Sequence, residues 1–186
     1  EMSASLVGSE MCIRDRNVQG ILLGGGYPEL CAEELSGNVS MRESIREAIA
    51  QGMPSVAECG GFMYLHETLT DEKGHTYPMA GAIRGGCHNT GKLVRFGYVN
   101  VTEQEAHFLS QKVIRAHEFH YYDSDNNGES CEAVKPTTGR KWKCIHEGEN
   151  FWWGYPHLYY PSNPAFVEHF IGEAKKWKKR EDRCKA

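Results

Sequence analysis

The sequence lacks several features that would place it in common protein classes. Its formal net charge is −4, so no excess of positive charge indicates a nucleic-acid-binding protein. No apolar run is long enough to span a membrane. Its seven cysteines form no C-x-x-C pair, and an odd number argues against a disulfide framework. These absences favour a reduced, cytoplasmic, globular protein that binds neither nucleic acid nor membrane.

Two further absences concern cofactors. The glycine run Gly24-Gly25-Gly26 follows an apolar stretch, but no Lys-Ser or Lys-Thr follows it at the spacing of a phosphate-binding loop. His117 and His120 do not have the H-E-x-x-H spacing of a zinc-binding helix, and in a strand they would point to opposite faces. The sequence therefore predicts neither a bound nucleotide nor a metal site.

Residues 1–16 are treated separately from the rest of the sequence, because part of this segment resembles non-native sequence. Leu6–Arg16 resembles a translated transposase adapter from sequencing-library preparation. We expect residues 1–16 to be a non-native leader, and a genuine flexible N-terminus is the alternative. Native-looking sequence begins near Asn17, and we expect one domain over residues 17–180 that is incomplete at its N-terminus.

The segment Pro54–Leu65 has the pattern of a strand, a sharp turn and a helix. Cys59 lies at the turn, Gly60 and Gly61 follow, and an apolar-periodic stretch begins at Phe62. Such an elbow lifts a nucleophile out of a sheet towards the first turn of a helix. There the backbone N–H groups and the helix dipole favour a thiolate, so we expect a lowered pKa for this cysteine. A buried structural cysteine is the alternative.

The order of the predicted elements indicates an α/β domain. Ile21–Leu23 is a predicted strand, a Ser40–Glu43 capping box starts a helix that ends at Gly52, and the helix after Cys59 is expected to reach about Leu69. Strand–helix–strand–helix order predicts parallel strands, with a ligand beyond their carboxyl ends. Both glycine-containing turns follow strands, so we expect them to face one pocket.

The second half predicts mainly strands, which we expect to extend the sheet in an antiparallel manner. A final helix is expected to start at Pro164, after the capping residue Asn163. We expect its inward face to carry Phe166, Val167, Phe170 and Ile171. The predicted strands are Tyr77–Ile83, Lys92–Thr102, Val113–Asp123 and Trp142–His146.

A cysteine nucleophile needs a base, and His157 is the best candidate. It is the one histidine in the apolar, strand-like stretch 151–160. The alternative is a buried histidine whose hydrogen bonds are made within the core and that has no catalytic role. Glu118 and His120 would share one face of a strand and are candidates to bind a polar substrate.

Four segments in order resemble the glutamine amidotransferase domain of cobyrinic acid a,c-diamide synthases, over about residues 17–172. The resemblance implies a triad-type class I amidotransferase fold, which is three-layer α/β with a flavodoxin-like parallel core and an antiparallel extension. The branch concerned works with a Cys–His pair. The segments are Gly24–Leu30, Ala57–Leu65, His117–Tyr121 and Pro156–Pro164.

The resemblance also implies roles for particular residues. Cys59 would be the nucleophile and His157 its base. On physical grounds, we expect backbone N–H groups of Gly60 and of Gly25 or Gly26 to form the oxyanion hole. The family hydrolyses glutamine and uses the ammonia, with ATP and Mg²⁺, to convert the a and c carboxylates of a corrin, cobyrinic acid, to amides in cobalamin biosynthesis.

Some expectations follow from differences to that family. The family has an ATP-binding domain before this one, and no phosphate-binding loop occurs here, so we expect this chain to hydrolyse glutamine, to bind no cofactor and to make no amide product. A homodimer is a further expectation. Nickel-sirohydrochlorin a,c-diamide synthase, which acts on another tetrapyrrole, and a non-catalytic module with an inert cysteine remain alternatives. Cobyric acid synthase fits less well because it lacks the Leu-Tyr-Tyr-Pro-Ser-Asn-Pro run.

Overall fold

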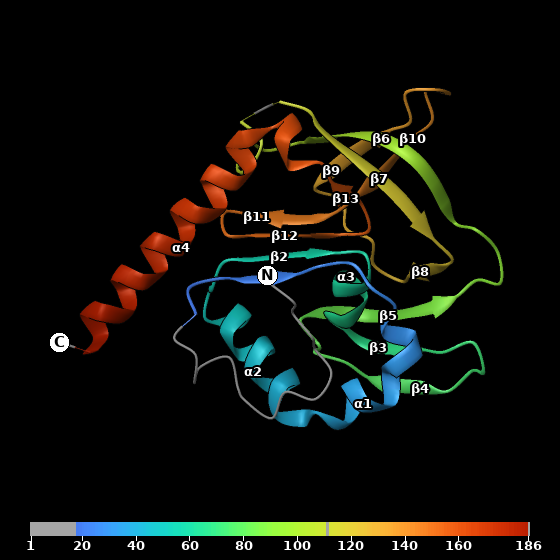
Figure 1. Cartoon of the computed structure of the whole chain (residues 1–186), viewed down its shortest axis with the longest axis horizontal. Helices are drawn as coiled ribbons and strands as arrows, with labels where there is room; N and C mark the ends of the chain where they lie inside the picture. The colour runs from blue at the N-terminus through green and yellow to red at the C-terminus, as the bar shows by residue number, and fades with distance from the viewer. Residues whose placement is uncertain (1–17, 111, 186) are drawn as a thin grey trace.

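The computed structural model describes residues 18–110 and 112–185 (Figure 1). The expected leader, residues 1–16, lies outside this part of the chain. Within it, no helix is both long and apolar enough to cross a membrane.

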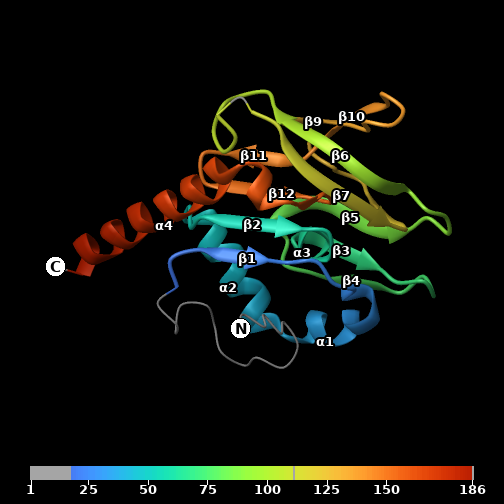
Figure 2. The same cartoon turned by 45° about the horizontal axis from the view of Figure 1, so that its top comes forward.

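A central four-stranded sheet carries the predicted parallel pairing. β1 and β12 both run parallel to β2, and β11 closes the edge beside β12 in the antiparallel direction. The arrowheads of β1 and β2 point the same way, towards α3, in Figure 2. The strands in spatial order are β1 (Ile21–Leu23), β2 (Ser55–Glu58), β12 (Phe151–Gly154) and β11 (His146–Gly148).

Two hydrophobic clusters lie on opposite faces of this sheet, which makes the fold a three-layer α/β arrangement. Ala57 and Trp153 belong to one cluster, together with residues of α2 (Val39–Ala50) and α3 (Gly60–Tyr64). Their neighbours Val56 and Trp152 belong to the other, together with residues of α4 (Pro164–Lys185) and a second sheet. Successive side chains of a strand point to opposite faces, so β2 and β12 each contribute to both clusters.

The remaining strands form two sheets of their own, so among the described residues the expected antiparallel extension of the central sheet consists of β11 alone. One is antiparallel throughout and has the order β10-β9-β6-β7-β13, and the other has the order β4-β3-β5-β8. The first consists of β6 (Arg95–Glu103), β7 (Ile114–His120), β9 (Cys131–Val134), β10 (Lys141–Cys144) and β13 (His157–Leu158). The second consists of β3 (His66–Thr70), β4 (Thr76–Pro78), β5 (Ile83–Asn89) and β8 (Tyr122–Ser124). Short helical segments are η2 (Pro28–Cys31), α1 (Ala32–Gly37) and η3 (Tyr160–Ser162).

The helix after the elbow is shorter than expected. α3 ends at Tyr64, and the chain continues as β3, where a helix to Leu69 was predicted. Leu69 fits an apolar helical period, but it is flanked by Thr68 and Thr70, whose β-branched side chains favour a strand. Pairing of β3 with both β4 and β5 decides the outcome.

The start of α2 differs from the predicted capping box, whereas its end is as predicted. The Asn38 side chain accepts a hydrogen bond from the Met41 N–H at 3.2 Å, so Asn38 and not Ser40 is the N-cap. Gly52 follows the C-cap with φ 90°, a conformation that favours glycine. Its buried face carries Ile45 and Ala48.

The final helix starts at Pro164 as predicted, but fewer of its apolar side chains face inward than predicted. Phe166 is buried and Phe170 packs against the same cluster, whereas Val167 and Ile171 are exposed. The prediction of an inward position is wrong for these two residues, because the start of α4 packs against the cluster only along the face that carries Phe166 and Phe170. The C-terminal end of the helix projects past the body of the molecule (Figure 1).

Substitution of Gly61 by alanine is expected to destabilise the fold. A Cβ atom at Gly61 would lie 2.3 Å from the Leu23 carbonyl oxygen, a backbone atom of β1 that cannot rotate away. We expect Gly61→Ala to lower the free energy of unfolding by about 1–3 kcal/mol in urea denaturation. Gly37→Ala is the matched control, because a Cβ there meets nothing within 4 Å. Equal stability of the two variants would contradict the close packing of α3 on β1.

Candidate active site

The predicted elbow is present at Cys59. The residue joins β2 directly to α3 with φ 49° and ψ −108°, a backbone conformation that residues with a side chain rarely adopt. Its N–H donates to the Gly154 carbonyl oxygen at 2.9 Å, and its own carbonyl accepts from the Met63 N–H at 2.9 Å. The neighbouring strand and helix thus hold the backbone in this conformation, with Cys59 at the carboxyl end of β2.

The two glycine-containing turns meet, as expected from their positions after β1 and β2. The Gly61 N–H donates to the Gly24 carbonyl oxygen at 3.1 Å. A Cβ at Gly60 would lie 2.5 Å from the Gly26 carbonyl oxygen, so only glycine lets the two backbones approach this closely.

His157 lies against the same glycine loop. It is the first residue of β13, which follows β12 closely in the chain, and its side chain is 40% exposed. A Cβ at Gly25 would lie 2.4 Å from the His157 Cε1 atom. The fold therefore assembles the predicted residues at one edge of the central sheet. The loop Gly24–Gly26 contacts both the imidazole ring and the turn that carries Cys59.

Two residues that the sequence analysis did not assign complete the arrangement. The Glu58 Oε2 atom lies 3.9 Å from His157 Nδ1, and the Tyr160 hydroxyl donates to Glu58 Oε1 at 2.5 Å. Burial raises the pKa of Glu58, and the hydrogen bond from Tyr160 opposes that shift. Their positions gave a signal, since Glu58 directly precedes Cys59 and Tyr160 lies three residues after His157.

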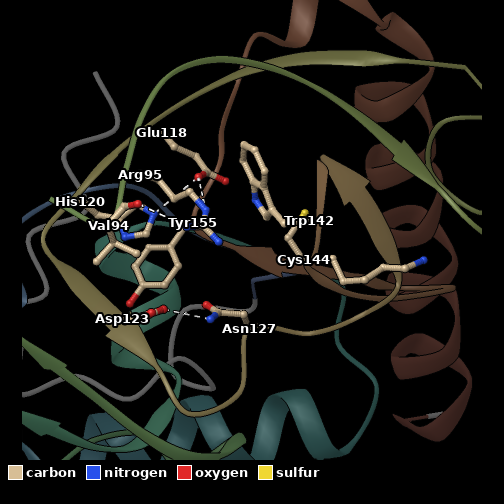
Figure 3. Close-up of a pocket in the computed structure, with 10 residues that line it drawn as sticks. Val94, Arg95, Glu118, His120, Asp123, Asn127, Trp142, Cys144 and Tyr155 are labelled. Carbon is tan, nitrogen blue, oxygen red and sulfur yellow. Dashed lines mark hydrogen bonds and ion pairs between the residues drawn. The ribbon is translucent and has the colours of Figure 1, made fainter. Parts of the chain in front are cut away.

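Glu118 and His120 share the inward face of β7, as the two-residue period of a strand predicts, whereas His117 lies on the opposite face. Both are buried, and the His120 ring stacks on Tyr155 with a centroid separation of 3.9 Å. They line a small, partly open cavity of about 30 Å³, drawn in Figure 3. The structure therefore buries the side chains of these two candidate substrate-binding residues in the wall of that cavity.

The pKa values describe a resting pair of thiol and neutral imidazole. Burial raises the pKa of Cys59 to about 11, and a hydrogen bond from the Gly60 backbone only partly opposes this. The expectation of a lowered thiol pKa is therefore wrong, because desolvation outweighs the effect of the five-residue helix α3. Burial, followed by His117 and His120, lowers the pKa of His157, while Glu118 opposes the shift.

Alkylation of Cys59 should show this high pKa directly. Only the thiolate reacts, so we expect the rate with iodoacetamide to rise about tenfold per pH unit from pH 7 and to level off only near the pKa of about 11. Peptide mass spectrometry after timed quenching would measure the rate at this cysteine alone. A plateau near pH 8 would contradict desolvation as the dominant influence.

The described residues offer no evident metal centre. No group of three or more histidine, cysteine, aspartate or glutamate side chains in residues 18–110 and 112–185 is placed to hold a metal ion.

Comparison with known proteins gives these observations a family context. The model of the CobB/CobQ-like glutamine amidotransferase domain matches residues 5–165. A cobyrinate a,c-diamide synthase of Fusobacterium nucleatum is 39% identical over 153 residues, which are 80% of this chain and 33% of that protein. A second, of Dehalococcoides mccartyi, is 33% identical over 183 residues, which are 90% of this chain and 40% of that protein. The chain spans about a third of the length of the curated relatives it matches.

Solved structures show the same fold at low sequence identity. A crystal structure of a glutamine amidotransferase superposes with a TM-score of 0.58 at 12% identity, over 84% of this chain and 79% of the other. The PurLQS structure from Thermotoga maritima superposes with a TM-score of 0.50 at 16% identity, over 81% and 78%. With a family model that matches most of its length, the chain belongs to the CobB/CobQ-like glutamine amidotransferase family.

Proposed function

We propose that this chain is the glutamine-hydrolysing part of an ATP-dependent amidoligase that converts the a and c carboxylates of cobyrinic acid to amides. The observation that carries the hydrolytic half is the strained elbow at Cys59 beside a loop that also contacts the His157 ring. The substrate assignment rests on the relatives, whose names state that they are cobyrinate a,c-diamide synthases.

The first step is attack of the Cys59 sulfur on the side-chain amide carbon of glutamine. Neutral His157 takes the thiol proton during the attack, because the resting thiol is protonated at neutral pH. The amide oxygen becomes an oxyanion, and the N–H of Gly60 and that of Gly25 or Gly26 are its donors. One such donor contributes about 3–4 kcal/mol to stabilising the transition state.

Collapse of the tetrahedral intermediate breaks the carbon–nitrogen bond. The His157 imidazolium donates its proton to the departing nitrogen, which leaves as ammonia, and a glutamyl thioester remains on Cys59. His157 then removes a proton from water, which hydrolyses the thioester to glutamate and restores the thiol.

Glu58 is the positioning residue for the base in this proposal. Its carboxyl group lies 3.9 Å from His157 Nδ1, which is close enough for electrostatic stabilisation of the imidazolium and too long for a hydrogen bond. The Tyr160 hydroxyl holds the opposite carboxyl oxygen, so the carboxyl group is fixed from a second side.

Amide formation needs the carboxylate of the acceptor to be activated, and ATP with Mg²⁺ would supply that activation. The described residues include no phosphate-binding loop and no cluster suited to a metal ion, so we assign no residue here to either. We propose that activation belongs to the part of the relatives that this chain does not match, and that the chain alone releases ammonia without forming amide.

The substrate proposal is tested with the full-length protein that contains this chain. It would be incubated with glutamine, ATP and Mg²⁺ and either cobyrinic acid or nickel-sirohydrochlorin, and the products identified by mass spectrometry. We expect a diamide of cobyrinic acid. A diamide of the nickel compound alone would overturn the corrin assignment and leave the hydrolytic half intact. Diamide made by the 186-residue chain alone would overturn the proposal that activation of the carboxylate needs another part of the protein.

The pH profile of glutamine hydrolysis should reflect the lowered pKa of His157. The base must be neutral, and kcat/KM reports groups of the free enzyme, so the activity should be lost only as the pH falls below the ordinary value of 6.5. His117 lowers this pKa, so His117→Asn should move the acid limb towards higher pH. An acid limb above pH 7 in the unsubstituted chain would contradict His157 as the base.

A further inference from the structure

The partly open cavity in Figure 3 has room for a single small molecule. Its volume of about 30 Å³ exceeds the space that one water-sized molecule needs, which is roughly 10–15 Å³ on the same measure. Glu118 and His120 reach it from β7, Arg95 from β6 and Trp142 from β10. The ring of Tyr155, which lies between Gly154 and His157 in the chain, completes the wall.

Two buried polar atoms in this wall have no hydrogen-bond partner among the described residues. They are Oε2 of Glu118 and Nε2 of His120. The side chains are 2% and 5% exposed, and the two atoms lie 3.6 Å apart, too far for a direct hydrogen bond. Leaving a buried polar atom without a hydrogen bond is unfavourable, so such a pair indicates a bound group.

Both atoms require a donor. His120 Nδ1 lies 2.7 Å from the Tyr122 carbonyl oxygen, which can only accept, so Nδ1 carries the proton. In the neutral imidazole Nε2 is then an acceptor, as is the carboxylate oxygen of Glu118. A small molecule with at least two N–H or O–H groups satisfies both atoms.

The charge of the surroundings favours a neutral molecule over a cation. The Arg95 Nε atom lies 4.0 Å from Glu118 Oε2, and the Arg95 guanidinium covers the Trp142 ring at 4.8 Å. The carboxylate therefore already faces a positive group. The other titratable groups that line the cavity are Asp123, Lys143, Cys144 and Tyr155.

The cavity adjoins the candidate catalytic residues. Glu118 follows His117, which pairs directly with His157 across β7 and β13. The ring of Tyr155 contacts His120 on the cavity side and lies 5.1 Å, between ring centroids, from Phe62 in α3, the helix that starts after Cys59. Glu118 and His120 are close enough to influence the pKa of His157.

We propose that this cavity binds one molecule of ammonia, whose N–H groups donate to Glu118 Oε2 and His120 Nε2. Ammonia has three N–H groups, carries no charge and fits the space. As the source of the ligand, the inference rests on the proposed release of ammonia at Cys59. The binding site itself is testable without that reaction.

The test uses the Cys59→Ala chain with ¹⁵N-labelled histidine, so that no ammonia arises from glutamine. Ammonium chloride would be titrated against sodium chloride at constant ionic strength while the His120 Nε2 resonance is followed. We expect a saturable shift with ammonium and none with sodium. Expressed as total ammonium, the affinity should tighten about tenfold per pH unit, because the neutral form becomes more abundant by that factor.

Matched variants test whether the binding of ammonia depends on Glu118. Glu118→Gln replaces one acceptor by an amide that can donate to His120, and we expect at least a tenfold loss of affinity. Glu132→Gln, at a half-buried carboxyl group that pairs with Lys141 outside the cavity lining, should leave the affinity unchanged.

Three results would overturn the proposal. A response no different from that with sodium would show that the cavity holds only water, and a response independent of pH would identify the ammonium ion. A protonated Nε2 on His120 across this pH range would remove the acceptor. A separate assay of the unsubstituted chain with glutamine tests the proposed function, and its failure would leave the binding result standing.

Discussion

Cys59→Ala is expected to abolish glutamine hydrolysis, lowering kcat by about 10⁴-fold or more, as for other enzymes that lose their nucleophile. Without the sulfur no thioester forms, and the remaining oxyanion donors act on an amide that only water can attack. The backbone at this residue is held by hydrogen bonds to Gly154 and Met63, which the substitution leaves in place. Release of glutamate from glutamine, followed by a coupled dehydrogenase assay, would measure the loss.

Cys31→Ala is the matched control for this experiment. Cys31 is another free cysteine, half-buried at the end of η2, and it has no part in the proposed reaction. We expect it to keep kcat within about twofold, since substitutions away from special features usually change little. Circular dichroism and thermal unfolding would show that both variants are folded. A folded Cys59→Ala chain that still hydrolyses glutamine would reject the nucleophile and, with it, the proposed mechanism.

Gly25→Ala should lower hydrolysis by about 10²-fold while the protein stays folded. The new Cβ would lie 2.4 Å from His157 Cε1 and 3.1 Å from Nδ1, so the imidazole ring has to move away from the glycine loop. A displacement of about an ångström in a catalytic group is enough for a loss of this size. Steady-state kinetics should show the change mainly in kcat, because the ring acts in the transition state.

The neighbouring glycine provides the control for that substitution. A Cβ at Gly24 meets nothing within 4 Å, so Gly24→Ala adds the same methyl group to the same loop without touching the imidazole ring. We expect it to keep near-normal activity. Equal losses in the two variants would indicate that the loop tolerates no side chain at all, and would contradict the specific contact with His157.

The sequence predicts those parts of the fold that depend on local signals. The strand at Ile21–Leu23, the elbow at Cys59, the helix stop at Gly52 and the helix start at Pro164 all follow from residues within a few positions of each other. The meeting of the Gly24 loop with the elbow could also be foreseen, because parallel strands bring their carboxyl ends to one edge.

Other features depend on contacts that a linear pattern does not contain. His66–Thr70 is a strand because β4 and β5 pair with it, and the division of the second half into two sheets depends on similar long-range pairing. The high pKa of Cys59 arises from burial by the whole fold, which outweighs the local helix. Glu58 and Tyr160 lie next to or near the predicted catalytic residues in the sequence, but their contact could not be predicted, because 102 positions separate them and only folding brings their side chains together.

The backbone at Cys59 has a consequence for how this protein can change in evolution. Its dihedral angles, φ 49° and ψ −108°, suit glycine better than any residue with a side chain. A mutation to glycine would relax the chain and remove the thiol in the same step. Selection for a more stable protein and selection for chemistry therefore act in opposite directions at this one position, and lineages that no longer need the reaction have a direct route to lose it.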